Sequence, residues 1–240
     1  MGRAFEYRKA AKLKRWGNMA RVFTKIGKGI EMAVKEGGPD PASNTRLRLL
    51  MQNAKSENMP KENVERAIKR AISKDTADYK EVQYEGYAPH GIAVMVETAT
   101  DNINRTVANV RMHFNKGGGS LGTNGCVGFM FEHKSTFKFK VAEGCDPEEL
   151  ELEMIDLGVD EFYAEEGEVT IFAPYESFGA IQKWLDENNY EIVSGEGVRI
   201  PTDTKSLTAA EREDVEKLVE KLEEDEDVVN VYTTMAEGDE

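Results

Sequence analysis

The spacing of apolar residues changes near Tyr79, and this change most restricts the folds open to the chain. Before it, apolar side chains recur every three or four residues, as amphipathic helices require. After it, short runs rich in β-branched and aromatic residues are separated by turn residues, which is typical of strands. The sequence therefore predicts an α+β protein whose N-terminal part is helical.

Three short helices are predicted within residues 1–78. The first runs from Met19 to Gly37-Gly38, because glycine accepts the left-handed conformation that follows a helix end. Asp40-Pro41 is expected to open the second helix, with the acid capping free N–H groups and proline in the first turn. Pro60 is expected to start the third. Brief connections between such helices predict a three-helix bundle.

Residues 133–204 show a complete α/β pattern. Their order of strands and helices, β-α-β-β-α-β, is that of a ferredoxin-like unit. The predicted strands are 135–141, 159–164, 169–173 and 190–198, and the predicted helices are 147–157 and 175–188. We therefore expect these residues to form one ferredoxin-like domain.

The segment 79–132 is an incomplete unit of the same type. Its predicted strands are 82–87, 92–97 and 126–132, and its one helix ends at Lys116. The tail, 205–240, supplies the missing helix, opened by a capping box at Thr208-Ala-Ala-Glu211, and the missing strand. We predict that 79–132 and 205–240 form one discontinuous α/β domain into which 133–204 is inserted.

Charge is divided unequally along the chain. Residues 1–80 hold 19 Lys and Arg against nine Asp and Glu, a net charge of +10. Residues 81–240 hold 12 against 36, a net charge of −24, so the overall charge of −14 averages two opposite parts. A strongly basic end indicates a partner that is nucleic acid or another polyanion.

The basic end begins with an arm, Met1 to about Asn18, that mixes cationic and aromatic residues. Lys and Arg displace counterions from phosphate chains, and aromatic rings stack on exposed bases. We expect nucleic-acid contacts from the arm and the first two helices, with Arg66, Lys69 and Arg70 extending the patch on the third. The predicted contact residues are Arg3, Arg8, Lys9, Lys12, Lys14, Arg15, Trp16, Arg21, Lys25, Arg46, Arg48 and Lys55.

Other interpretations of the charge pattern stay open. The basic residues can be ordinary solvated surface, and the arm a disordered tail. A targeting peptide has a similar charge, although the arm lacks the serine enrichment typical of one. The acidic part can serve solubility alone, or it can attract a basic protein partner.

Residues suited to catalysis are few and scattered. His90, His113 and His133 lack metal-ligand spacing, so neither a metal nor another cofactor is predicted. Cys126 with a histidine is a candidate thiol site, but its apolar neighbours favour a buried structural cysteine. Lys116-Gly-Gly-Gly-Ser120 follows a helix and lacks P-loop spacing, which favours a helix stop over a phosphate site. The chain is expected not to be an enzyme.

Compartment and membrane association are constrained by what the sequence lacks. Two cysteines without a CxxC motif give no disulfide framework, and the longest apolar runs fall far short of the ~20 residues of a membrane span. No apolar run typical of a secretory signal follows the N-terminus. We expect a cytoplasmic protein that does not bind membranes.

Short motifs distributed along the chain carry a more specific indication. They are Gly37-Gly-Pro-Asp-Pro41, Asn44, Leu47-Arg48, Ala54-Lys55, Asn58-Met-Pro-Lys61, Ala67-Ile-Lys69, Tyr84-Glu-Gly-Tyr-Ala-Pro89, Thr100-Asp-Asn102, Asn104-Arg-Thr106, Val110-Arg111, Gly118-Gly119, Arg199-Ile-Pro201 and Asp227-Val-Val-Asn-Val-Tyr232. Together they resemble the YebC/PmpR family over essentially the whole chain. The opening, Gly2-Arg-Ala-Phe-Glu-Tyr-Arg-Lys9, departs from the family's common glycine-histidine-serine-lysine-tryptophan start.

The resemblance implies a helical N-terminal domain and two α/β domains in a non-enzymatic, cytoplasmic protein. Family members are described either as DNA-binding transcriptional regulators or as ribosome-associated translation activators that relieve stalled elongation. Both activities use contacts to phosphate, so the sequence does not separate DNA from ribosomal RNA as the partner. We expect a DNA-binding transcriptional regulator, with a translation activator on the ribosome as the alternative.

Overall fold

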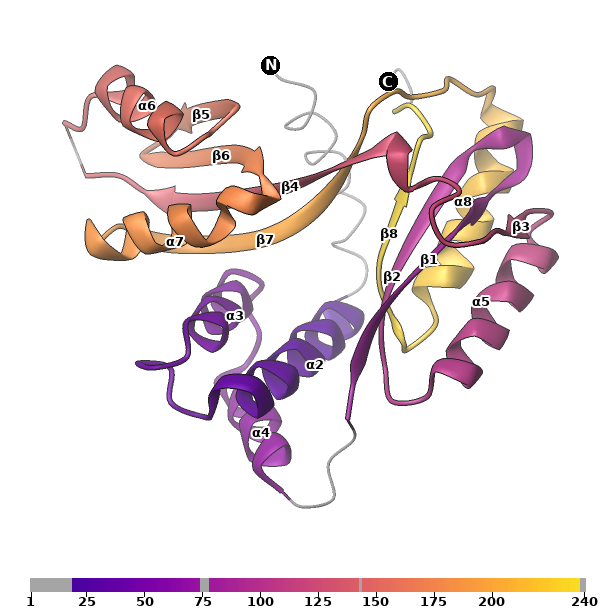
Figure 1. The fold of residues 1–240 in the computed structure, drawn as a ribbon, viewed down its shortest axis with the longest axis horizontal. Helices are drawn as coiled ribbons and strands as arrows, with labels where there is room; N and C mark the ends of the chain where they lie inside the picture. Colours follow the sequence, from indigo (N-terminus) through magenta and orange to yellow (C-terminus); the bar gives the residue numbers. More distant parts are fainter. Residues whose placement is uncertain (1–18, 74–77, 143, 238–240) are drawn as a thin grey trace. The chain divides into compact units, whose positions relative to one another are not determined.

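The computed structural model describes residues 19–73, 78–142 and 144–237 (Figure 1). The described residues form two compact units: those up to Ile72 with those of His133–Ile200, and those of Ser73–Glu132 with those from Pro201. Helices come first, and two four-stranded sheets follow. The predicted α+β class is confirmed. The predicted domain limits at 78, 132 and 204 stay predictions.

The first three helices form the expected bundle. They are α2 (Met19–Gly37), α3 (Thr45–Ser56) and α4 (Lys61–Ile72). Ile30, Leu47 and Ala67, one from each helix, are fully buried and share one apolar core. Burial of these apolar stripes, at roughly 25 cal/mol per Å², stabilises helices that are too short to be stable alone.

The predicted start of the second helix is wrong. Asp40-Pro41 lies in a turn, where the Asp40 carboxylate accepts the N–H of Ala42 at 3.0 Å. Helix α3 begins four residues later, with Asn44 as its N-cap: the Asn44 Oδ1 accepts the N–H of Leu47 at 3.0 Å. The Asn44 amide also donates to the Ala33 and Gly38 carbonyls at 2.7 and 2.8 Å, so one buried side chain joins two helix ends. Asn44 caps α3 and also binds two carbonyls at the end of α2. These additional contacts explain why Asn44, and not Asp40, is the N-cap.

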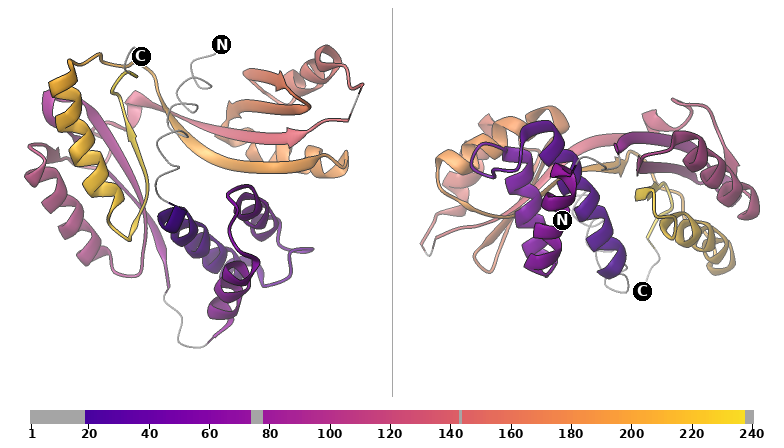
Figure 2. Two further views of the ribbon diagram at one scale, coloured as in Figure 1. Left: turned by 180° about the vertical axis from the view of Figure 1, so that it is seen from behind. Right: turned by 90° about the horizontal axis from the view of Figure 1, so that it is seen from below.

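The tail completes the sheet of the discontinuous domain. Strands β1 (Lys80–Tyr87), β2 (Ala93–Thr100), β3 (Ser120–Leu121) and β8 (Val228–Thr233) lie in the order β3-β1-β2-β8. Strand β8 pairs antiparallel with β2, so chain segments more than a hundred residues apart share one sheet. Helices α5 (Ile103–Lys116) and α8 (Ala209–Glu223) lie side by side over this sheet (Figures 1 and 2). The pairing of β8 with β2 agrees with the predicted discontinuous domain, whose limits stay predictions.

The inserted domain has the ferredoxin-like topology. Its elements are β4 (Phe131–Lys140), α6 (Pro147–Asp156), β5 (Glu161–Glu165), β6 (Glu168–Pro174), α7 (Phe178–Glu187) and β7 (Glu191–Pro201). The sheet order is β5-β6-β4-β7. Phe137 and Phe139 of β4 pack with Ile171, Ile181 and Leu185 in the main core of the domain.

The strand predicted at 126–132 is wrong. Residues 122–127 form a loop, Gly128–Met130 a short 3-10 turn, and β4 begins only at Phe131. The reason is Glu85, a buried residue of β1 whose carboxylate accepts the N–H groups of Gly125, Val127 and Gly128 at 2.7–2.9 Å. N–H groups held by a carboxylate are not available to a strand ladder.

Candidate nucleic-acid interface

The described part of the bundle is basic. Residues 19–73 hold 11 Lys and Arg against six Asp and Glu, whereas 133–200 hold five against 17. The two regions belong to the same compact unit, so the difference in charge lies between two parts of one body. The search for a polyanion site therefore centres on the surface of α2, α3 and α4.

The structure describes none of the predicted contact residues of the arm, but it describes the two of the first helix. Arg3, Arg8, Lys9, Lys12, Lys14, Arg15 and Trp16 lie outside the described residues. Arg21 and Lys25 lie on α2 and are both partly exposed. All nine stay predicted contact residues.

The three predicted cations of α3 are engaged with carboxylates of the same unit. Arg46 pairs with Glu36 of α2 at 2.7 Å. Arg48 binds Asp186 of α7 at 2.6 Å and also donates to the Pro41 carbonyl at 3.1 Å. Lys55 lies 4.0 Å from Glu191 of β7, with most of its side chain in solvent. Of the three, Arg48 is most clearly part of the architecture.

Helix α3 is fastened to the inserted domain by more than charge. The Asn53 side chain exchanges two hydrogen bonds with the backbone of Gly195, at 2.8 and 2.9 Å. Gln182 of α7 donates to the Thr45 carbonyl at 3.3 Å. Leu49 is buried in the core that contains Phe137. The bundle is thus held on the inserted domain by α3. These contacts join residues far apart in the sequence, so the local sequence does not indicate them.

Helix α4 presents its cations differently. Arg66 and Lys69 are exposed and form no ion pair with any described residue. Arg70 pairs with Glu31 of α2 at 2.9 Å, while 60% of its side chain stays exposed. The Glu31 side chain is 5% exposed, and burial raises its pKa, opposed by the nearby positive charges of Arg70, Lys35 and Lys28. The α2–α4 face therefore combines solvent-accessible cations with one buried carboxylate.

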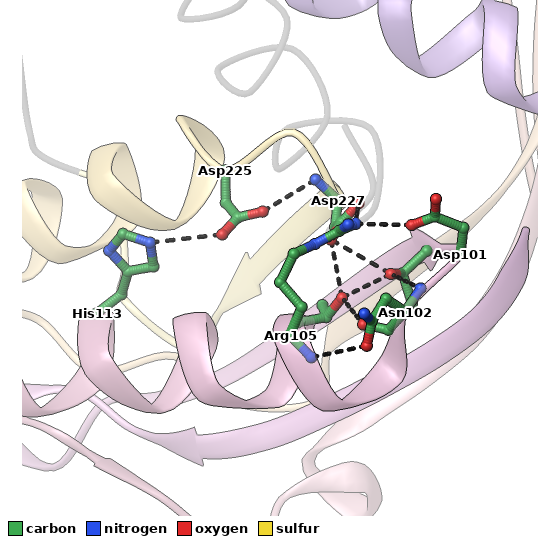
Figure 3. Close-up of polar contacts among 8 residues, drawn as sticks. Asp101, Asn102, Arg105, His113, Asp225 and Asp227 are labelled. Atoms are coloured by element: carbon green, nitrogen blue, oxygen red, sulfur yellow. Dashed lines mark hydrogen bonds and ion pairs between the residues drawn. The ribbon is translucent and has the colours of Figure 1, made fainter. Parts of the chain in front are cut away.

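A second polar network lies in the other unit and involves the Thr100-Asp-Asn102 and Arg105-Thr106 motifs (Figure 3). The buried Asp227 carboxylate accepts hydrogen bonds from Thr100, Thr106 and the Arg105 guanidinium at 2.7–3.2 Å. Asn102 caps α5 by accepting the Arg105 N–H at 3.1 Å. These residues join β2, α5 and the start of β8, so their role is to close the discontinuous domain.

The glycine loop after α5 is explained by packing. Gly118 has a φ of +73°, and a Cβ on Gly119 would lie 2.4 Å from the Tyr87 carbonyl oxygen. A side chain is therefore excluded where the loop passes β1. This agrees with the helix stop that the sequence favours.

Two of the residues considered for catalysis, Cys126 and His133, lie in surroundings that disfavour their charged forms. Burial and the nearby Glu85 carboxylate raise the pKa of the Cys126 thiol, which disfavours the reactive thiolate. His133 stacks on Tyr175 at 3.7 Å, and its pKa is lowered to about 4 by burial and by Arg199. The described residues contain no group of three or more His, Cys, Asp or Glu that could hold a metal ion.

Comparison with known proteins covers nearly the whole chain. Residues 3–74 match the domain described as "TACO1/YebC protein N-terminal domain", and residues 79–235 match "TACO1/YebC second and third domain". The chain belongs to the TACO1/YebC family. No described helix is long and apolar enough to cross a membrane.

Relatives within the TACO1/YebC family are close. A protein of Parabacteroides distasonis named "Probable transcriptional regulatory protein" is 63% identical over 239 residues, covering 100% of this chain and 98% of the relative. A protein of Porphyromonas gingivalis with the same name is 62% identical and covers 99% and 98%. The crystal structure of a conserved hypothetical protein from Aquifex aeolicus has 36% identity and a TM-score of 0.73, covering 92% of this chain and 91% of that one.

Proposed function

We propose that this TACO1/YebC protein is a non-enzymatic regulator of gene expression that binds nucleic acid through its basic N-terminal region, acting in the cytoplasm as a DNA-binding transcriptional regulator. The observation that carries the proposal is the accessible positive charge on α4, at Arg66 and Lys69, in a chain whose residues 81–240 are strongly acidic. Such cations bind a phosphate backbone by releasing its condensed counterions.

The division of charge supports one mode of binding. The α/β regions repel phosphate, so a nucleic acid is directed to the bundle and the arm that precedes it. Because α3 is hydrogen-bonded to the inserted domain, the bundle is held on a folded body. The relatives' names agree with a regulatory role.

The experiment measures the affinity of the full chain for a labelled 30-base-pair duplex by fluorescence anisotropy, at several salt concentrations. The test variant carries Arg66→Gln and Lys69→Gln. If both residues contact phosphate, affinity at low salt falls about tenfold, and the slope of log K against log salt becomes shallower by roughly 1.8.

A matched control changes the total charge equally. Lys217→Gln with Lys221→Gln removes two cations from the acidic helix α8, where they pair with Glu213 and Glu224. This control is expected to bind within twofold of the unchanged protein. Equal losses in both double variants, or no salt-dependent binding at all, would overturn the proposal.

The partner is then identified directly. Crosslinking in cells with sequencing of the bound nucleic acid is expected to recover promoter DNA. Recovery of ribosomal RNA, together with co-sedimentation with ribosomes at moderate salt, would replace transcription by the translational alternative while leaving the basic surface in its role.

A further inference from the structure

Burying a carboxylate inside a small helical bundle is costly unless it is paired and hydrogen-bonded. Glu31 lies on the buried side of α2, between the fully buried Ile30 and the buried Ala33. An apolar side chain would fill the same position without the loss of hydration.

The partner of Glu31 comes from the other helix of the proposed interface. Arg70 Nη2 lies 2.9 Å from Glu31 Oε1, and a Cβ added to Gly27 would lie 3.9 Å from the same nitrogen. The guanidinium therefore crosses α2 at Gly27 and Glu31, one helical turn apart. Its inner side contacts a buried acceptor while most of the side chain remains in solvent.

Several cations surround this pair. Lys28, Lys35 and Arg70 all act electrostatically on the single Glu31 carboxylate. Arg66, one helical turn before Arg70 on α4, and Lys69 add two exposed cations. The Glu31–Arg70 pair therefore lies in a part of the bundle that carries several cations and that attracts a phosphate.

On the basis of the proposed function, we infer that Glu31 is a positioning residue that holds the Arg70 guanidinium in the orientation in which it binds a nucleic-acid phosphate. A guanidinium fixed on one side by a carboxylate loses less conformational entropy when it binds phosphate with its planar array of donors. Lysine at the same position would supply the charge without the planar fork.

The decisive variant is Glu31→Gln, because orientation and net charge predict opposite results. Removing a negative charge from a phosphate-binding surface would tighten binding if charge alone mattered. If Glu31 orients Arg70, binding of the 30-base-pair duplex weakens three- to tenfold in spite of the added positive charge. Glu36→Gln is the matched control: it removes the same charge from an exposed residue of the same helix, and we expect equal or slightly tighter binding.

A second variant tests the same inference from the side of the arginine. Arg70→Lys keeps the positive charge and leaves Glu31 with a partner, so the fold is retained even if Glu31→Gln unfolds the bundle. We expect a three- to tenfold loss of affinity with little change in the salt slope, and thermal unfolding of each variant checks the fold.

The outcomes separate the inference from the function on which it rests. Failure of the unchanged protein to bind DNA or RNA would overturn the proposed function. Normal or tighter binding by folded Glu31→Gln, or normal binding by Arg70→Lys, would overturn the positioning role alone.

Discussion

Helices α3 and α4 have the same length, twelve residues, and both are basic, yet the structure uses their cations in different ways. Arg46, Arg48 and Lys55 of α3 meet carboxylates that come from α2, α7 and β7. Arg66 and Lys69 of α4 meet none among the described residues. The comparison teaches that the charge of a helix does not tell whether its cations are available to a partner, because the deciding carboxylates lie far away in the chain.

The largest effect that tests this comparison is expected at Arg48. Arg48→Met keeps the aliphatic stem but removes the bonds to Asp186 and to the Pro41 carbonyl. Both ends of the ion pair are about one-third exposed, so solvent limits the loss to roughly 1–2 kcal/mol of unfolding free energy. Urea denaturation measures it, and Arg48→Met combined with Asp186→Asn isolates the coupling.

Nucleic-acid affinity of the same Arg48→Met variant should stay within twofold of the unchanged protein. A tenfold loss of affinity with unchanged stability would contradict the difference drawn between α3 and α4. Arg48 would then contact nucleic acid, as is proposed for Arg66 and Lys69.

A smaller effect is expected from His133, which lies in the domain that holds α3. Its pKa is about 4 in the folded protein and about 6.5 when unfolded, so the unfolded state takes up the proton first as pH falls. Unfolding free energy therefore decreases between about pH 6.5 and pH 4 and levels off below, by about 1 kcal/mol once partial solvent exposure is allowed for. Denaturation at pH 7 and at pH 4.5 measures the decrease.

The control for this titration is His133→Phe, which keeps a ring against Tyr175 but cannot take a proton. The part of the pH dependence that comes from His133 should disappear in this variant. An identical pH dependence in both proteins would show that other groups cause it.

Hydrogen exchange tests the difference between α3 and α4 in another way. The backbone amides of α3 should lose protection from exchange together with those of the inserted domain.

The smallest effect is expected at Lys55. Its nitrogen lies 4.0 Å from Glu191, and 84% of its side chain is exposed, so the pair is weak. Lys55→Gln should change thermal stability by less than ~0.5 kcal/mol. The affinity of Lys55→Gln for nucleic acid shows whether Lys55 contacts the partner. A loss of twofold or more at low salt would group Lys55 with Arg66 and Lys69 as a contact residue. No loss would group it with Arg48 as a residue engaged within the fold.

Much of the fold follows from local rules. The capping box at Thr208 and Glu211 forms as the motif predicts, with Thr208 accepting from the backbone and Glu211 reaching back to it. The β-α-β-β-α-β order also gives the observed sheet. Both mistaken element starts have one cause. Asn44 and Glu85 bind backbone N–H groups, and in both cases the full set of partners is visible only in three dimensions.

The site was less predictable than the fold. Arg46, Arg48 and Lys55 were expected from their charge to contact nucleic acid, and no local signal indicated Glu36, Asp186 or Glu191 beside them. The role inferred for Glu31 depends on Arg70 from another helix, so the local sequence did not indicate it.

By itself the sequence determined the α+β class, the type and order of most helices and strands, and the concentration of positive charge at the N-terminal end. Hydrophobic period, capping residues and net charge are properties of short segments, so they are already present in the unfolded chain. Only the tertiary structure decided which cations are neutralised and which remain accessible, because an ion pair depends on a distance of a few ångströms between residues such as Arg48 and Asp186, 138 positions apart.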